Sequence, residues 1–192
     1  MYAIVKDGAI TATGNIKQLF PNTSFAGGVA NAEFKTAEGV KDIVQGERKD
    51  QKYYYVTQGD ITLVDGVPTQ QYTNTAKRLN DEDAKDADGN QLYVQEWDDD
   101  TETMVNTSIK QVNQGLKTPM TAEVKNTANK LLAPTDWMVI RKTERDVAIP
   151  SATATYRAAV ITECARLETA ISNASDVDAL AAVMGAQNWP AE

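Results

Sequence analysis

The spacing of apolar residues changes along this chain, and the change limits the folds open to it. In residues 1–80 apolar and polar residues alternate in short β-prone runs, whereas from about residue 119 apolar residues recur every three or four positions. Alternation is typical of strands and the longer period of helices. The sequence therefore predicts an α+β fold: a small N-terminal antiparallel β domain (1–80), a central acidic β arm or linker (81–118) and a small C-terminal helical domain (119–192).

Two Asp-Gly dipeptides predict hairpins in the N-terminal part. Asp7-Gly8 interrupts YAIVKDGAIT, and Asp65-Gly66 interrupts ITLVDGVPTQQYT. Asp-Gly tolerates the positive φ angles of a two-residue hairpin turn. The tyrosine-rich run KDQKYYYVTQ favours a further strand, and NIKQLFP begins with a helical turn that the proline ends. These elements suffice for a small sheet.

The middle of the chain is rich in acidic residues, and two of its motifs invite a metal ion. In DEDAKDADGN, Gly89 at the sixth position of a calcium loop puts Ala84 at the first and Gln95 at the twelfth, where carboxylates are needed. In EWDDDTE, consecutive aspartates point in diverging directions. Both motifs therefore favour solvated surface charge. The alternation in QLYVQEW favours a strand after the Gly89-Asn90 turn, so a hairpin arm and a linker are the two alternatives for this segment.

The C-terminal part predicts four helices in succession. MTAEVKNTANKLL carries one apolar side, and Thr135-Asp136 caps a second helix. Pro150-Ser151 begins a third, and a fourth ends at Gly185. The apolar stripe of the second helix consists of Trp137, Val139, Ile140 and Val147, that of the third of Tyr156, Val160, Cys164, Leu167 and Ile171, and that of the fourth of Val177, Leu180, Ala181 and Met184.

Several chemistries are excluded by composition. The chain has no histidine and one cysteine, Cys164, which excludes Ser-His and Cys-His nucleophile pairs, intrachain disulfides and thiolate metal clusters. Cys164 lies on an apolar stripe, so we expect a core thiol with a raised pKa. We expect no catalytic residue, cofactor-binding residue or metal ligand. The net charge of -8 argues against nucleic acid partners, and no apolar run approaches a membrane span, so we expect a soluble intracellular product.

An ordered set of short motifs near the C-terminus resembles the C-terminal region of bacteriophage tail-fibre proteins and tail-fibre assembly proteins. The motifs are LL-x-x-TDW, R-x-x-E, IP, TYRAAV and NWP. The start of the chain, MYAIVKDGAI…LFPNTSF…KDQKYYYV…VDGVPTQQYTNT, is similar to a small β-rich module of phage virion proteins. Residues 81–118 carry no such resemblance. The C-terminal motif residues are Leu131, Leu132, Thr135, Asp136, Trp137, Arg141, Glu144, Ile149, Pro150, Tyr156, Arg157, Trp189 and Pro190.

The resemblance implies a non-enzymatic structural protein of the phage tail, in the fibre or at its connection to the baseplate, that acts by protein–protein docking. A transient chaperone of fibre assembly is the alternative. The partners would be fibre, baseplate or adaptor subunits and further copies of the chain in a homo-oligomer such as a trimer; the protein would be made in the host cytoplasm and reside in the virion tail. The implied docking and packing residues are Thr135, Asp136, Trp137, Arg141, Glu144, Pro150, Tyr156, Arg157 and Trp189.

Each of these side chains has an expected mechanical role. Thr135 or Asp136 would cap a helix, Trp137 and Tyr156 would pack two helices together, and Pro150 would fix their joint. Arg141 and Arg157 would face carboxylates of the same or a neighbouring subunit, and Trp189 would be buried against a neighbouring subunit or domain. A competing hypothesis is an acid–base or metal-dependent enzyme, such as a polysaccharide-cleaving tail component, and the missing histidines weigh against it.

Overall fold

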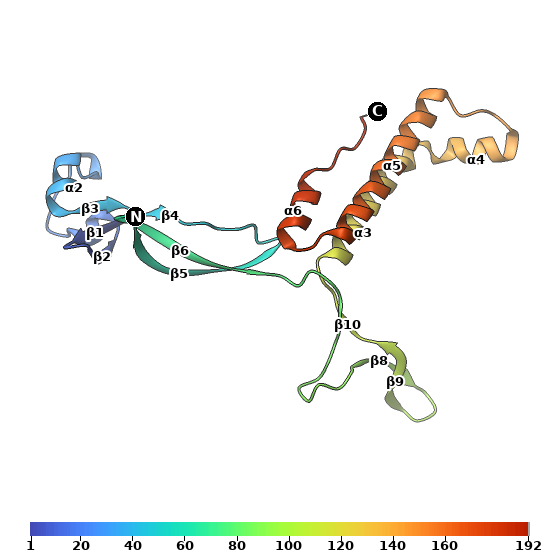
Figure 1. Ribbon diagram of the computed structural model, residues 1–192, viewed down its shortest axis with the longest axis horizontal. Coiled ribbons are helices and arrows are strands. Elements are labelled where there is room, and N and C mark those ends of the chain that lie inside the picture. The colour runs from blue at the N-terminus through green and yellow to red at the C-terminus, as the bar shows by residue number, and fades with distance from the viewer. Residues whose placement is uncertain (192) are drawn as a thin grey trace. The chain divides into compact units, whose positions relative to one another are not determined.

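The computed structural model describes residues 1–191 and has the mixed α+β architecture that the sequence predicts, with small sheets first and helices last (Figure 1). The chain divides into two compact units, residues 1–76 and the part from Lys77 onward.

The first unit contains two three-stranded sheets with strand orders β2-β1-β3 and β4-β6-β5. All pairings are antiparallel except the two-residue pairing of β4 with β6. Both Asp-Gly hairpins form as predicted, and all four turn residues have positive φ. The strands are β1 (Tyr2–Lys6), β2 (Ala9–Gly14), β3 (Val40–Asp42), β4 (Val44–Gln45), β5 (Tyr54–Val64) and β6 (Val67–Ala76).

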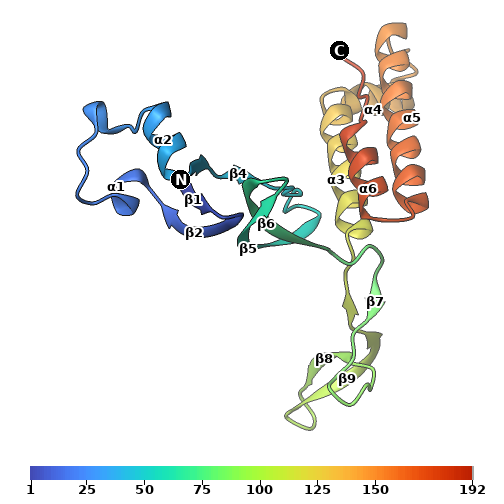
Figure 2. The ribbon, with the colours of Figure 1, turned by 60° about the vertical axis from the view of Figure 1, so that its left-hand side comes forward.

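Short helices accompany the first of these sheets. Asn15 caps α1 (Ile16–Leu19) through a capping box with Gln18. A 3₁₀ turn, η1 (Ala26–Gly28), precedes α2 (Ala32–Glu38), which Asn31 caps and which ends at Gly39 in the left-handed conformation. Figure 2 shows α1 and α2 beside β1 and β2. The small core consists of Ile16, Ala30 and Val40, surrounded by Tyr2, Ile4, Phe20, Phe25 and Phe34.

The second unit begins with a β arm. A short pair, β7 (Glu82–Asp83) with β10 (Val112–Asn113), forms its root, and the two-stranded ribbon of β8 (Tyr93–Asp98) and β9 (Thr103–Lys110) forms its end. Asp81 fastens the root of the arm to the start of α3 (Lys117–Leu132). Its carboxylate accepts hydrogen bonds from Gly115 N (2.8 Å), just before the helix, and from Thr118 Oγ1 (2.8 Å), in its first turn. The central segment is therefore a hairpin arm rather than a slack linker.

The four predicted helices all form. They are α3 (Lys117–Leu132), α4 (Asp136–Arg145), α5 (Ser151–Asn173) and α6 (Val177–Gly185), with a 3₁₀ turn, η2 (Ala133–Thr135), between α3 and α4. Helices α3, α5 and α6 lie side by side in both views (Figures 1 and 2). Their buried apolar side chains are Met120, Val124 and Ala128 from α3, Val160, Leu167 and Ile171 from α5, and Val177, Leu180 and Met184 from α6.

Candidate docking surface

Arg157 of α5 holds the start of α4 in place. Its Nη1 donates to the carbonyl oxygen of Leu132 (2.9 Å) and to Thr135 Oγ1 (2.6 Å), and its Nη2 donates to Asp136 Oδ1 (2.8 Å). The guanidinium is largely shielded from solvent, with 15% of the side chain exposed. A planar guanidinium that satisfies several acceptors at once fixes geometry better than a point charge would. The predicted partnership of Arg157 with a carboxylate is confirmed, and it lies within one chain.

Trp137 does not pack α4 against α5, so that expectation is wrong. Its side chain is 51% exposed, and the guanidinium of Arg141 lies over its ring, 4.8 Å from the centroid. Successive helical residues point about 100° apart. Because Asp136 faces Arg157, the next residue, Trp137, faces away from α5. Arg141 therefore meets an aromatic ring instead of the expected carboxylate.

Thr135 and Tyr156 take part in the joint between α4 and α5. Thr135 occupies the N-cap position but makes no capping bond, because its hydroxyl donates to the Leu132 carbonyl oxygen and accepts from Arg157. The expectation that the Thr135 side chain caps the helix is therefore wrong. Tyr156 is half-buried and lines a cavity of about 200 Å³ with Thr135, Ala152 and Thr153. This cavity is open to solvent.

The other implied docking residues lie apart from this joint. Pro150 stands immediately before α5 at its N-cap position and is exposed, as is Glu144 on α4. The salt bridges of residues 1–191 include neither Glu144 nor Arg145 of α4. Trp189 is half-buried and donates from Nε1 to Gln187 Oε1 (2.7 Å). Its burial by a neighbouring subunit stays a prediction.

Helix α4 exposes the whole of its apolar stripe. None of its ten residues is buried, and Ile140 is 58% exposed. Val139, on the same helix, and Val147, just beyond it, are also exposed. Clustered exposed apolar side chains on one element are typical of binding surfaces, whereas scattered ones are not. The stripe is therefore the first part of the candidate docking surface.

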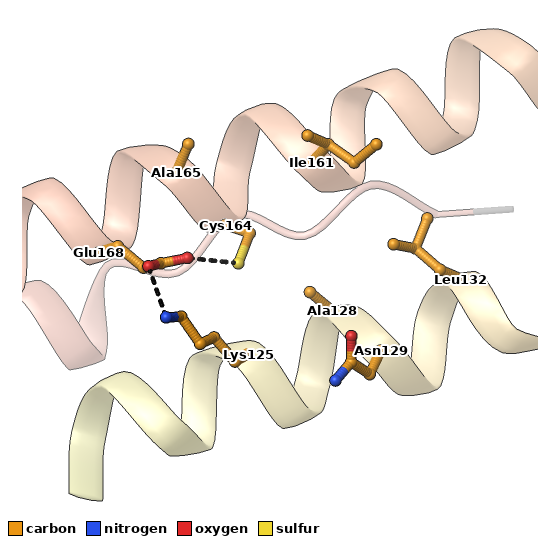
Figure 3. Close-up of a pocket in the computed structure, with 8 residues that line it drawn as sticks. All are labelled: Lys125, Ala128, Asn129, Leu132, Ile161, Cys164, Ala165 and Glu168. Carbon is orange, nitrogen blue, oxygen red and sulfur yellow. Dashed lines mark hydrogen bonds and ion pairs between the residues drawn. The ribbon is translucent and has the colours of Figure 1, made fainter. Parts of the chain in front are cut away.

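A groove between α3 and α5 forms the second part (Figure 3). It has a volume of about 330 Å³. At one end, Glu168 accepts from Lys125 Nζ (3.1 Å) and from Cys164 Sγ (3.3 Å). At the other end, Ile161 is 56% exposed. The lining residues are Lys125, Ala128, Asn129, Leu132, Ile161, Cys164, Ala165 and Glu168. Sequence reasoning missed this groove, because its residues belong to two helices whose pairing the periodicity does not specify.

Cys164 lies in the wall of the groove rather than wholly in the core. Burial raises the pKa of its thiol, and the hydrogen bond to Glu168 raises it further, as predicted in direction. The hydrogen bond from Lys125 lowers the pKa of Glu168. The thiol is therefore protonated at neutral pH and acts as a weak donor to a carboxylate.

A buried carboxylate fastens the end of the chain to α5. Glu163 receives two hydrogen bonds from Arg166, each of 2.7 Å, and a third from the backbone N–H of Asn188 at 2.7 Å. Arg166 also donates to the carbonyl oxygen of Ala186 (3.0 Å). The hydrogen bond from Arg166 lowers the pKa of Glu163 despite its burial. Sequence reasoning missed this clamp, although an acidic and a basic residue three positions apart on a helix were a usable signal.

The arm carries the net negative charge of the chain. Ten of the 27 acidic residues and two of the 19 basic residues lie within residues 81–110, so this segment accounts for the full net charge of -8. Trp97 and Met104 face each other across the ribbon and are 57% and 52% exposed. At its tip Asp98 accepts from Thr101 Oγ1 (2.9 Å), a bond that lowers the pKa of Asp98. Among residues 1–191 no three His, Cys, Asp or Glu side chains are grouped to hold a metal ion.

Comparison with known proteins adds no relative: no family model, curated protein or solved structure matches this chain. Within residues 1–191 no helix combines the length and the apolar character needed to cross a membrane.

Proposed function

We propose that this chain is a non-enzymatic structural protein of a bacteriophage tail, in the fibre or at the connection between fibre and baseplate, and that it acts by protein–protein docking. One observation carries the proposal. The residues of the TDW and YR motifs act together: Arg157 grips Thr135 and Asp136, and this grip leaves the neighbouring Trp137 exposed. A tryptophan that the motifs hold exposed to solvent contributes little to the core and is available to bind another molecule.

The exposed Trp137 and the half-buried Arg141 of α4 are of the types that dominate binding energy at protein interfaces. Trp and Arg are enriched among the few interface residues whose truncation costs most affinity. Trp137 and Arg141 stack on one another, so part of the ordering entropy of both side chains is already lost before a partner arrives. A preorganised Trp–Arg pair on a helix held by Arg157 supports a docking role.

The partners that we propose are fibre, baseplate or adaptor subunits of the same tail, and further copies of this chain in a homo-oligomer such as a trimer. The protein would be made in the host cytoplasm and remain in the virion. The resemblance of the motifs supports this assignment, and the modular organisation, with a β unit, a β arm and a helical end, suits a connector with more than one neighbour.

Mass spectrometry of highly purified, salt-washed phage particles tests the proposal. We expect the chain at a fixed copy number relative to the fibre protein, in a multiple of three or six. Absence from particles, with the chain instead co-purifying with free fibre protein from infected cells, would overturn the proposal in favour of the assembly chaperone.

A matched pair of variants tests whether α4 is the part that docks. Trp137→Ala removes the aromatic side chain from α4, and Trp97→Ala removes one of similar exposure from the arm. We expect particles to incorporate the Trp137→Ala chain at least tenfold less and the Trp97→Ala chain at the normal level. Equal incorporation of both variants would rule out α4 as the docking element.

A further inference from the structure

Helix α4 is held to the rest of the helical part by few contacts. It buries none of its ten residues, whereas α3, α5 and α6 each bury three or more. Apart from the turn η2 that precedes it, its backbone runs closely along no other element of residues 1–191, and Figure 1 shows it projecting away from the three packed helices. Packing of an apolar side supplies most of the stability of a helix in a protein, and α4 has little of it.

The sequence of α4 also gives it little stability as a separate helix. Its ten residues fall below the length at which isolated helices are stable in water. Its N-cap residue makes no side-chain capping bond, and the β-branched Val139, Ile140 and Thr143 lower its helix propensity. Asp136 in the first turn and the cations of the last turn favour the helix only weakly, because they are exposed to solvent. The helix therefore depends on contacts outside itself.

Both ends of α4 lie at breaks in the helical backbone. Thr135, just before it, has φ -112° and ψ 2°, outside the helical range, and follows a proline. Asp146, just after it, is left-handed with φ 52°, and residues 147–150 have no regular structure before α5 begins. Rotation at these two joints leaves the hydrogen bonds within α3 and α5 intact, so α4 is able to leave its position alone.

One side chain joins the packed helices to the start of α4. The guanidinium of Arg157 donates to the carbonyl oxygen of Leu132 at the end of α3, to Thr135 Oγ1 at the joint and to Asp136 Oδ1 in α4. All three hydrogen bonds belong to one planar group, so they form together and are lost together when the side chain turns away.

We propose that α4 opens as a unit separate from the three packed helices and that Arg157 is the latch that holds it closed. Trp137 and Arg141 lie four positions apart, so they stack only while this segment is helical. The closed latch therefore presents the Trp137–Arg141 pair, and opening disperses it. The inference rests on the docking role proposed above and makes Arg157 a residue that positions the docking surface.

Amide hydrogen exchange of the purified full-length chain, resolved by NMR, tests the separate opening. We expect residues 140–146, whose amides are hydrogen-bonded within α4, to exchange at least about a hundredfold faster than residues 160–171 of α5. We also expect them to share one dependence on low concentrations of denaturant, as the amides of a cooperative unit do. Equal protection of α4 and α5 would overturn the inference.

A matched pair of variants tests the latch. Arg157→Met keeps an apolar stem but loses all three hydrogen bonds, and we expect exchange in residues 140–146 to rise at least about tenfold while exchange in residues 160–171 stays the same. Lys142→Met removes an exposed cation from α4 itself and should change neither segment by more than about threefold. An equal rise in both segments of Arg157→Met would mean that Arg157 supports the whole bundle, which would reject the latch.

The coupling between Arg157 and Asp136 separates a latch from general support. The side chain of Asp136 is 56% exposed, so the fold tolerates Asp136→Asn. We expect this change to speed exchange in α4 at least about threefold more in the wild type than in the Arg157→Met chain, where the bond that it weakens is already absent. The same factor in both backgrounds would contradict the inference.

Incorporation into particles tests the positioning role. Arg157→Met leaves Trp137 and Arg141 in place, and we expect particles to take up less of it than of the wild type. Normal incorporation of an Arg157→Met chain would reject the positioning role.

The exchange measurements use the purified chain, so their outcome is separate from that of the mass spectrometry of particles. A latch that fails them in a chain present in particles would be rejected, and the tail assignment would stand. A latch that passes them in a chain absent from particles would be retained, and the tail assignment would be rejected.

Discussion

Helices α4 and α5 each carry apolar residues at helical spacing, but only α5 buries them. In α5, Val160, Leu167 and Ile171 are fully buried against its neighbours, whereas α4 buries none of its residues. The buried residues of α5 lie seven and four positions apart, and Trp137 and Ile140 of α4 lie three apart, so both sets follow the helical period. The difference teaches that the period determines on which side a helix collects its apolar residues, but not whether the chain itself covers that side. The uncovered stripe is available to another molecule.

The largest change in the free energy of unfolding should come from a substitution on the buried side of α5. Leu167→Ala leaves a cavity between α3, α5 and α6, and we expect it to lower the free energy of unfolding by about 2–5 kcal/mol. Chemical denaturation of the full-length chain, followed through the helical signal, measures the change. A loss below about 1 kcal/mol would mean that the core of α5 is much looser than its complete burial indicates.

The C-terminal clamp should have the next largest effect. Glu163→Gln keeps the shape of the side chain but removes the charge that Arg166 and the N–H of Asn188 bind. We expect a loss of about 1–3 kcal/mol, because hydrogen bonds to a charged group are replaced by weaker ones. Amide hydrogen exchange should become faster at residues 186–189. Unchanged exchange there would show that the clamp does not hold the end of the chain.

The same carboxylate should make stability depend on pH. Its pKa in the folded chain lies below the ordinary value of 4.5, so the ionised form binds Arg166 and the folded state binds protons less readily than the unfolded state. The stabilisation is therefore complete above pH 4.5 and is lost as pH falls through the lowered pKa. Denaturation between pH 2 and 6 should show a smaller slope for Glu163→Gln than for the wild type.

A smaller effect is expected where α4 meets α5. Arg157→Lys keeps the charge but replaces the two nitrogens that reach Leu132, Thr135 and Asp136 by a single one, and we expect a loss of about 1 kcal/mol. Amide exchange in residues 133–140 should become faster while exchange in α6 stays the same. Arg145→Lys, at an exposed position of α4, is the matched control and should change neither.

The smallest effect should come from the exposed stripe. Val139→Ala removes a partly exposed side chain from α4, and at concentrations where the chain is monomeric we expect a change within about 0.5 kcal/mol. Equal destabilisation by Val139→Ala and Leu167→Ala would contradict the contrast between an exposed α4 and a buried α5, since Val139 would then belong to the core.

Local elements were the most predictable part of the fold. Asp7-Gly8 and Asp65-Gly66 identified their hairpins because few dipeptides adopt two positive φ angles in succession. The helices α3, α5 and α6 followed from their apolar period. Helix α2 was missed, although Asn31 before it and Gly39 after it are ordinary start and stop signals. Its seven residues are too few for the apolar period to be visible.

The candidate docking surface was predictable only in part. Arg157 and Asp136 were named as functional residues and do pair, but which acceptors Arg157 would reach depends on how α4 and α5 approach each other. The outward position of Trp137 follows from that approach. The α3–α5 groove and the clamp at Glu163 join residues distant in the sequence, and no periodicity within one helix specifies such contacts.

The sequence by itself determined the elements, the order of β unit, acidic arm and helices, and the absence of imidazole and disulfide chemistry, because turn dihedrals, apolar period and composition are local properties. Only the tertiary structure decided which apolar stripe is buried and which is left open, and that Leu132, Thr135 and Asp136 share one arginine. Burial depends on which surfaces of different elements the fold brings together, and no pattern within a single helix specifies those pairings.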